Sequence, residues 1–160
     1  MKILVDADSC PKPTRDAILR AIQRTSISGI FVANRPIPGI TEDHLCTMEV
    51  CGNHSGAADD RIVELAEPGD LAITRDIPLA SRLVEAQVSV IDDRGRLYSK
   101  ENIRERLSLR DFMVGLADHG LGPERIASYG KRELKSFADG FDRELQRLIR
   151  LARGTGPGSA

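Results

Sequence analysis

Aromatic side chains are scarce in this sequence. Phenylalanine, tyrosine and tryptophan together make up 4% of the 160 residues, and tryptophan is absent. Proteins that bind single-stranded nucleic acid without sequence preference stack successive bases on aromatic rings. The chain has no series of aromatic residues for this purpose, which argues against a dedicated single-strand binding platform.

Long apolar runs are missing and cysteines are few. No stretch approaches the roughly 18 consecutive apolar residues that indicate a transmembrane helix, so we expect no membrane association. The three cysteines, Cys10, Cys46 and Cys51, form an odd set, and no signal peptide precedes the first strand-like run. We therefore expect a reducing, cytoplasmic location.

Neither sign of charge is in excess. The chain carries 23 lysines and arginines against 24 aspartates and glutamates, so the total charge identifies no partner. The distribution is uneven, because conspicuous aspartates lie in the first half and many arginines in the second. The sequence therefore allows an acidic site flanked by basic surface.

What the sequence does contain is an alternation of strand-like and helical segments. Predicted strands cover residues 3–5, 29–33, 45–50, 71–74 and 88–91, with a short extension at 97–98. Predicted helices cover 56–66, 77–86, 101–118 and 131–153, and one more begins after Ser9 with two prolines in its first turn. This order predicts a three-layer α/β domain whose central, mainly parallel sheet has about five strands. We expect one domain over residues 1–153 and a disordered tail over 154–160.

Aspartates stand at the ends of these segments. Asp6 and Asp8 close the first strand, and they would point to the same side if the strand stayed regular that far. Asp76 follows the fourth strand and Asp59 opens a helix. The carboxyl ends of strands in open α/β sheets are where ligands bind, so folding could bring all four acids to one rim.

Such a cluster has a definite chemistry. Neighbouring carboxylates repel one another unless a proton or a cation lies between them. Hard oxygen ligands suit Mg²⁺ or Mn²⁺, which in turn suit phosphate chemistry. The alternative interpretation is helix capping, because Asp8, Asp59 and Asp76 each stand where a helix could begin and the hydroxyls of Ser9 and Thr74 lie at similar positions. Capping is a poor explanation for Asp6.

Five stretches together resemble a known family: VDADSCP, FVAN, ADDRIVELAEPGDLAITRDIPLA, DDRGRLYSKENIRERLSLRDFM and FADGFDREL. From Met1 to Arg150 the chain resembles the YaiI/YqxD family of uncharacterised bacterial proteins, related in fold to PIN and NYN domains. The resemblance implies a PIN-like fold, whose active members are metal-dependent ribonucleases. By this resemblance the catalytic and metal-binding residues are Asp6, Asp8, Asp59 and Asp76.

The chain departs from the pattern of that family at three positions. Gly56 stands where an aspartate is common, three residues before the acid of the helix. Arg75 stands where an alanine is frequent, beside Asp76, and Asp93 stands where a proline is usual in a turn. A missing carboxylate and an added cation would weaken metal affinity, although Arg75 could instead bind a phosphate.

Three further arginines are candidates for substrate binding. Arg104, Arg106 and Arg110 fall at helical spacings that could present guanidinium groups on one face, suited to phosphate contacts. The alternative is an ordinary solvated helix face.

Three functions are consistent with these features. The first is a metal-dependent nuclease, a hydrolase of RNA phosphodiesters, with Asp6 and Asp76 as principal ligands of Mg²⁺ or Mn²⁺ and Asp8 and Asp59 holding a second ion or orienting water. The second is a catalytically degenerate PIN-like module that binds RNA or a protein partner. The third is a phosphatase of the haloacid-dehalogenase type with Asp6 as nucleophile, which lacks a convincing lysine in the middle of the chain. The sequence leaves the oligomeric state open.

Overall fold

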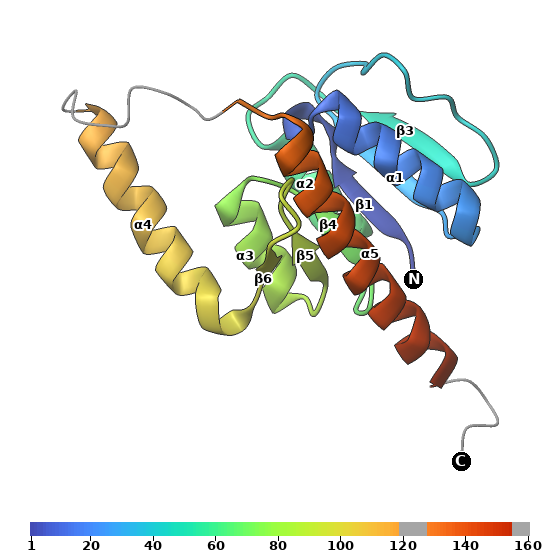
Figure 1. The fold of residues 1–160 in the computed structure, drawn as a ribbon. Coiled ribbons are helices and arrows are strands. Elements are labelled where there is room, and N and C mark those ends of the chain that lie inside the picture. The colour runs from blue at the N-terminus through green and yellow to red at the C-terminus, as the bar shows by residue number, and fades with distance from the viewer. Residues whose placement is uncertain (119–127, 155–160) are drawn as a thin grey trace.

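The computed structural model describes residues 1–118 and 128–154, in which strands and helices alternate around one sheet (Figure 1). The strands are β1 (Ile3–Asp6), β2 (Gly29–Ala33), β3 (Cys46–Val50), β4 (Leu71–Ile73), β5 (Ser89–Ile91) and β6 (Leu97–Tyr98). The helices are the 3-10 turn η1 (Ala7–Ser9), α1 (Lys12–Thr25), α2 (Ala57–Leu65), α3 (Ile77–Glu85), α4 (Lys100–Asp118) and α5 (Lys131–Gly154). The predicted three-layer α/β architecture is confirmed.

Two details differ from the expectation. The sheet has six strands, because Leu97–Tyr98 pairs with β5 and adds an antiparallel edge to an otherwise parallel sheet. Gly154, which we expected in the tail, is the last residue of α5, and the remainder of the predicted tail, 155–160, lies outside the described residues.

Strand β1 shows how the sequence builds the layers. Its apolar residues are fully buried, as in parallel strands that are covered on both faces. Ile3 and Val5 pack in a core with α1 and α5, whereas Leu4 packs in a second core with α2 and α3. Alternation along the strand therefore sends successive side chains into opposite layers.

Strand order fixes where a ligand can enter. The order across the sheet is β3-β2-β1-β4-β5-β6, so the chain moves outward from β1 in one direction and, after β3, returns to continue from β4 in the other. Strands β1 and β4 are parallel neighbours, with Val5 opposite Ile73. Their carboxyl ends border the switch point at which α/β sheets bind ligands.

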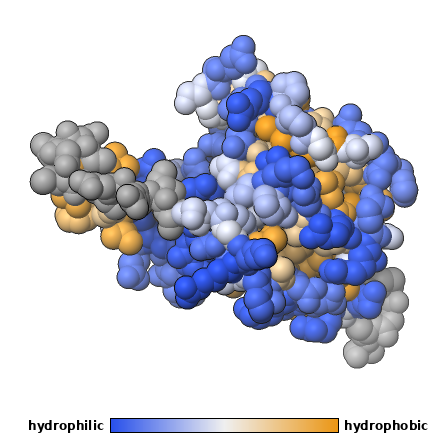
Figure 2. Space-filling model, turned by 45° about the horizontal axis from the view of Figure 1, so that its top comes forward, coloured by the Kyte–Doolittle hydropathy of each residue, from blue (hydrophilic) through white to orange (hydrophobic). Residues whose placement is uncertain are grey.

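Helix α4 is covered over only part of its length. In its first half, Ile103 is buried in the core formed with α3, and Leu107 packs against that core. Leu109, Phe112 and Val114, farther along, are exposed, and Figure 2 shows apolar side chains gathered at this end of the molecule. No helix in the described ranges is both long enough and apolar enough to cross a membrane.

Candidate functional site

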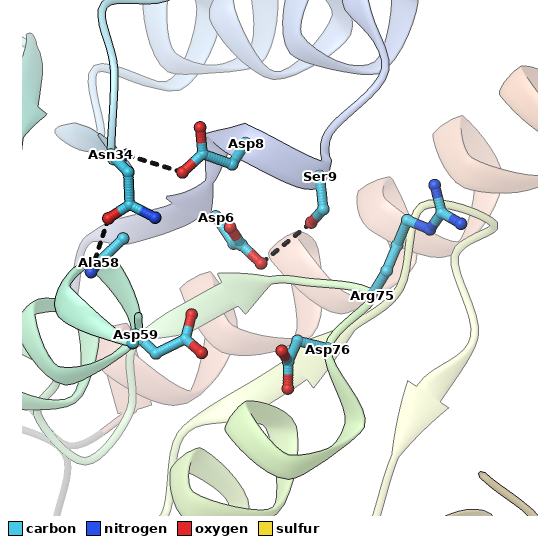
Figure 3. A pocket seen from close by; sticks show the side chains of 9 residues that line it. Asp6, Asp8, Ser9, Asn34, Ala58, Asp59, Arg75 and Asp76 are labelled. Atoms are coloured by element: carbon cyan, nitrogen blue, oxygen red, sulfur yellow. Dashed lines mark hydrogen bonds between the residues drawn. The ribbon is translucent and has the colours of Figure 1, made fainter. Parts of the chain in front are cut away.

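A cavity of about 520 Å³ opens at the switch point between β1 and β4 (Figure 3). We call it the acidic cavity, because all four aspartates expected at the rim line it. Its lining consists of Asp6, Asp8, Ser9, Asn34, Gly56, Ala58, Asp59, Arg75 and Asp76. Residues that lie up to 70 positions apart in the sequence thus share one wall, because parallel strands end at the same edge of the sheet.

Asp6 is the most deeply buried acid of this cavity. It is the last residue of β1 and only 6% exposed. Its Oδ2 accepts hydrogen bonds from Thr74 Oγ1 at 2.7 Å and Ser9 Oγ at 2.9 Å, and its Oδ1 accepts none from the described residues. Burial, together with Asp76 and Asp8, raises the pKa of Asp6, while the two hydroxyls act in the opposite direction. The hydroxyls hold one oxygen and leave the other for a ligand.

Asp8 reaches the cavity by a different route from the one we expected. The strand does not continue to Asp8, because the chain turns into η1 directly after Asp6. The predicted alternation is therefore wrong at this point. Asp8 lies on the exposed turn, where its Oδ2 accepts a hydrogen bond from the backbone N–H of Asn34 at 2.7 Å. The same turn brings Ser9 back to Asp6, so Ser9 does not cap α1.

Asp76 is a helix cap as well as a lining residue. Its Oδ1 accepts a hydrogen bond from the backbone N–H of Leu79 at 2.9 Å at the start of α3. Its own N–H donates to Thr74 Oγ1 at 3.0 Å. Thr74 therefore links the two acids, donating to Asp6 while accepting from Asp76. The capping interpretation holds for Asp76, and its second carboxylate oxygen takes no hydrogen bond from the described residues.

Asp59 is the acid with the fewest partners. It lies in the first turn of α2, where Gly56 is the N-cap residue, and its carboxylate accepts no hydrogen bond in the described part of the chain. Figure 3 shows it pointing across the cavity toward Asp76. Burial, with Asp76 and Asp6 nearby, raises the pKa of Asp59 to about 6, and Arg82 opposes this rise. Its charge is thus poorly compensated at neutral pH.

Asn34 is a lining residue to which we assigned no role from the sequence. It follows β2 directly, donates its backbone N–H to Asp8, and accepts a hydrogen bond from the backbone N–H of Ala58 through its side-chain oxygen at 3.3 Å. The sequence could have indicated Asn34 as a site residue, because FVAN ends a buried strand with a polar residue just as VDAD does. Asn34 ties the turn that carries Asp8 to the helix that carries Asp59.

Arg75 lines the cavity but is directed away from the acids (Figure 3). Its Nε lies 3.6 Å from Oδ2 of Asp93, a buried oxygen that has no hydrogen-bond partner. Burial raises the pKa of Asp93, and Arg75 and Arg94 counteract part of that rise. Two of the departures from the family pattern, Arg75 and Asp93, thus face each other, so the guanidinium is engaged outside the cavity.

The arginines of α4 do not line the acidic cavity. Arg104 lines a separate cavity between α3 and α4. The guanidinium of Arg106 lies over the ring of Tyr98, with 4.4 Å between its Cζ and the ring centroid, and Arg110 pairs with Asp111 at 3.3 Å. The structure therefore places these three residues apart from the four aspartates.

The carboxylates do not form a ready-made metal cage. In the described ranges, no three histidine, cysteine, aspartate or glutamate side chains lie close enough together to hold an ion directly. The donor set nevertheless fits a hard cation. Mg²⁺ keeps several of its waters and is usually bound by one or two carboxylates, so a hydrated ion needs few direct ligands. An open, water-accessible cavity lined by carboxylate oxygens meets that requirement.

Comparisons with known proteins agree on one family. A family model described as "Uncharacterized BCR, YaiI/YqxD family" matches residues 4–147. A "UPF0178 protein" of Treponema pallidum is 49% identical over 153 residues, covering 96% of this chain and 86% of the relative. A "UPF0178 protein" of Myxococcus xanthus is 44% identical over 150 residues, covering 94% and 97% respectively. No solved structure matches the chain significantly.

Proposed function

We propose, from the premise that the chain belongs to the YaiI/YqxD family, that it is a divalent-metal-dependent nuclease-like protein acting on RNA phosphodiester bonds. One observation carries the proposal: four carboxylates from separate elements line one cavity at the switch point of the sheet. The likeness to PIN domains, which we inferred from sequence motifs, belongs to the same proposal.

The electrostatics of the cavity support a cation as its ligand. Gathering four carboxylates opposes folding unless a positive charge or a proton offsets their repulsion. Arg75 does not supply that charge, because it is directed to Asp93. The pKa of Asp59 is raised by burial and by Asp76 and Asp6, as expected for a carboxylate whose negative charge is poorly compensated.

The residues would divide the work as follows. When bound, Mg²⁺ or Mn²⁺ would polarise a phosphoryl oxygen and activate a water molecule. Asp6 would hold the ion through Oδ1, because Ser9 and Thr74 fix its other oxygen. Asp76 would use the oxygen that does not cap α3. Asp8 and Asp59 would hold a second ion or orient the attacking water.

Cleavage of RNA with and without Mn²⁺ or Mg²⁺ tests the proposal. We expect metal-dependent cleavage that falls by two or more orders of magnitude in Asp6→Asn. Asp139→Asn is the matched control, because Asp139 lies on the exposed face of α5 and pairs with Lys135. A folded Asp6→Asn protein that cleaves as fast as the wild type would overturn the proposal.

A second function is favoured by a specific observation. In the described ranges no three acidic side chains lie close enough together to hold an ion directly, and Gly56 adds no carboxylate to the cavity that it lines. Both features suit a catalytically degenerate PIN-like module that binds RNA or a protein. Stabilisation by Mn²⁺ without turnover of any RNA would favour this function over the nuclease.

The phosphatase alternative gains no comparable support. It requires a second acidic pair, Asp92 and Asp93, to face Asp6. Neither residue lines the acidic cavity. Asp92 instead accepts hydrogen bonds from the backbone N–H groups of Arg94 and Arg96 in its own turn.

A further inference from the structure

A second cavity, of about 380 Å³, adjoins the acidic cavity and shares Asp8 with it. We call it the arginine cavity. Its other lining residues include Arg15 from α1, Arg35 from the loop after β2, and the segment Pro36, Ile37 and Pro38. A cavity lined by two cations and an apolar segment thus lies directly beside one lined by four acids.

The two arginines keep donors free for a ligand. In the described part of the chain, Arg15 forms no ion pair, and its guanidinium donates one hydrogen bond, from Nη1 to the backbone oxygen of Cys10. Arg35 is 77% exposed at its side chain and forms a long ion pair with Asp8, with 3.9 Å between its Nε and Oδ1 of Asp8. That distance is beyond hydrogen-bond range, so no hydrogen bond occupies its donors within the described residues. A guanidinium carries five N–H donors in a fixed fork that matches the oxygens of a phosphate.

The rim of the molecule offers another group of arginines, but it is less available. Arg94, Arg96 and Arg132 line a cavity of about 210 Å³ that shares no lining residue with the acidic cavity. Arg94 pairs with Asp93 at 3.2 Å, and Arg96 pairs with Asp92 at 2.7 Å. Two of its three cations are therefore already neutralised, which leaves the arginine cavity as the better anion site.

We propose that the arginine cavity binds the phosphate of the nucleotide adjacent to the one cleaved, so that the substrate is an RNA strand longer than one nucleotide. This inference rests on the proposed function. The acidic cavity by itself repels a polyanion, whereas Arg15 and Arg35 attract it one step along the strand. Binding energy from this non-reacting phosphate would hold the scissile one beside Asp6 and Asp8.

The apolar wall suits the rest of that nucleotide. Ile37 packs against the core beneath the loop, and the prolines on either side have fixed φ angles. The fixed φ angles and the packing of Ile37 therefore reduce the conformational entropy that this segment would lose on binding a ligand. The segment provides apolar contact for a ribose or base in a chain that has no series of aromatic rings for stacking.

The test is equilibrium binding of a fluorescent single-stranded RNA oligonucleotide, measured by anisotropy in Mg²⁺. Asp6→Asn serves as the background, so that cleavage does not interfere. We expect Arg15→Ala and Arg35→Ala each to weaken binding about five- to twentyfold. The slope of log K against log salt should fall by about 0.7 for each arginine removed. A labelled mononucleotide should show no such loss.

Arg20→Ala is the matched control, because Arg20 is an exposed residue of α1 that lines neither cavity. Arg35 forms no hydrogen bond within the described residues, so its variant tests the site even if Arg15→Ala fails to fold. Equal affinity of Arg35→Ala and Arg20→Ala would overturn the inference. An RNA-binding defect in Arg35→Ala, found together with a wild type that cleaves no RNA, would retain the subsite and reject the nuclease.

Discussion

Asp6, the most buried acid of the acidic cavity, is held by hydroxyl groups rather than by an opposite charge. Thr74 is buried and connects Asp6 to the backbone of Asp76, while Ser9 secures the same oxygen of Asp6 from the neighbouring turn. Hydroxyls can hold a carboxylate in place without neutralising it. The charge therefore stays available to a cation.

Replacing Thr74 by valine tests this arrangement. Because the hydroxyl stabilises the ionised form of Asp6, its loss should raise the pKa of Asp6 further and lower the free energy of unfolding by about 1–3 kcal/mol. NMR titration of the carboxyl carbon gives the first quantity and urea unfolding the second. Thr47→Val, at an exposed position on β3, should change neither. An unchanged Asp6 pKa in Thr74→Val would contradict the role of the Thr74 hydroxyl in stabilising the ionised form of Asp6.

The pH dependence of stability should reveal Asp59. Burial and the neighbouring acids raise its pKa from 3.8 to about 6, so the folded protein holds a proton that the unfolded chain releases. The stability from this group is therefore fully present below about pH 4 and is lost as the pH rises through 6. At neutral pH the ionised Asp59 opposes folding.

Asp59→Asn should accordingly be more stable than the wild type at pH 7.5. A gain of about 1 kcal/mol is expected, less than the full shift would give, because the side chain is partly solvent-screened. In urea unfolding curves, the difference in free energy of unfolding between Asp59→Asn and the wild type should disappear below pH 4. Asp60→Asn is the control, since Asp60 pairs with Arg82 at 3.0 Å and should not gain stability. A pH-independent gain in Asp59→Asn would contradict the titration.

Among the elements, α5 is positioned by a contact between two glycines. A Cβ added at Gly140 would overlap the backbone of Gly95 in the turn after β5, and Gly95 has a positive φ of 76°. The stripe that contains Phe137 and Phe141 can therefore lie flat against the sheet.

Gly140→Ala should destabilise the protein by about 1–3 kcal/mol, because the atoms it meets are backbone and cannot rotate away. Gly115→Ala is the matched control on α4, where a Cβ meets nothing within 4 Å. At that position the alanine should raise the free energy of unfolding by about 0.5–1 kcal/mol, because alanine has a higher helix propensity than glycine. Chemical unfolding of both variants measures the difference. Equal effects of the two alanines would show that the glycine contact is unimportant.

For the molecule as a whole, the acidic cavity joins parts of the chain that are distant in sequence. Its acids come from the end of β1, from η1, from α2 and from the start of α3, on both sides of the switch point. A cation bound there would tie these parts together only in the folded state. Ion binding and global stability should therefore be linked.

Thermal unfolding in Mn²⁺ measures that linkage without any assay of activity. At a concentration about a hundredfold above the dissociation constant, Mn²⁺ should stabilise the wild type by about 2.7 kcal/mol. Asp6→Asn should lose most of this effect, whereas Asp139→Asn should keep it. Equal stabilisation of the wild type and Asp6→Asn would show that the ion binds elsewhere.

Much of the architecture could be predicted because it follows from local rules. Fully apolar runs such as Ile3–Val5 predict strands covered on both faces, and the spacing of Phe137 and Phe141 predicts a helix with one buried stripe. The pairing of the edge strand Leu97–Tyr98 was harder to predict, because a strand of two residues shows no periodicity. At Asp8 a rule of strand alternation failed because the backbone left the strand one residue earlier.

By itself the sequence determined the family, the alternation of strands and helices, and the four aspartates that stand at their ends, because each of these depends on residue types and short-range spacing. Only the tertiary structure decided the position and the partners of each acid in the cavity. Strand order brings Asp76 beside Asp6, the 3-10 turn gives Asp8 and Ser9 different tasks, and Asp93 draws Arg75 away from the cavity. These outcomes depend on contacts between distant segments, which no local pattern encodes.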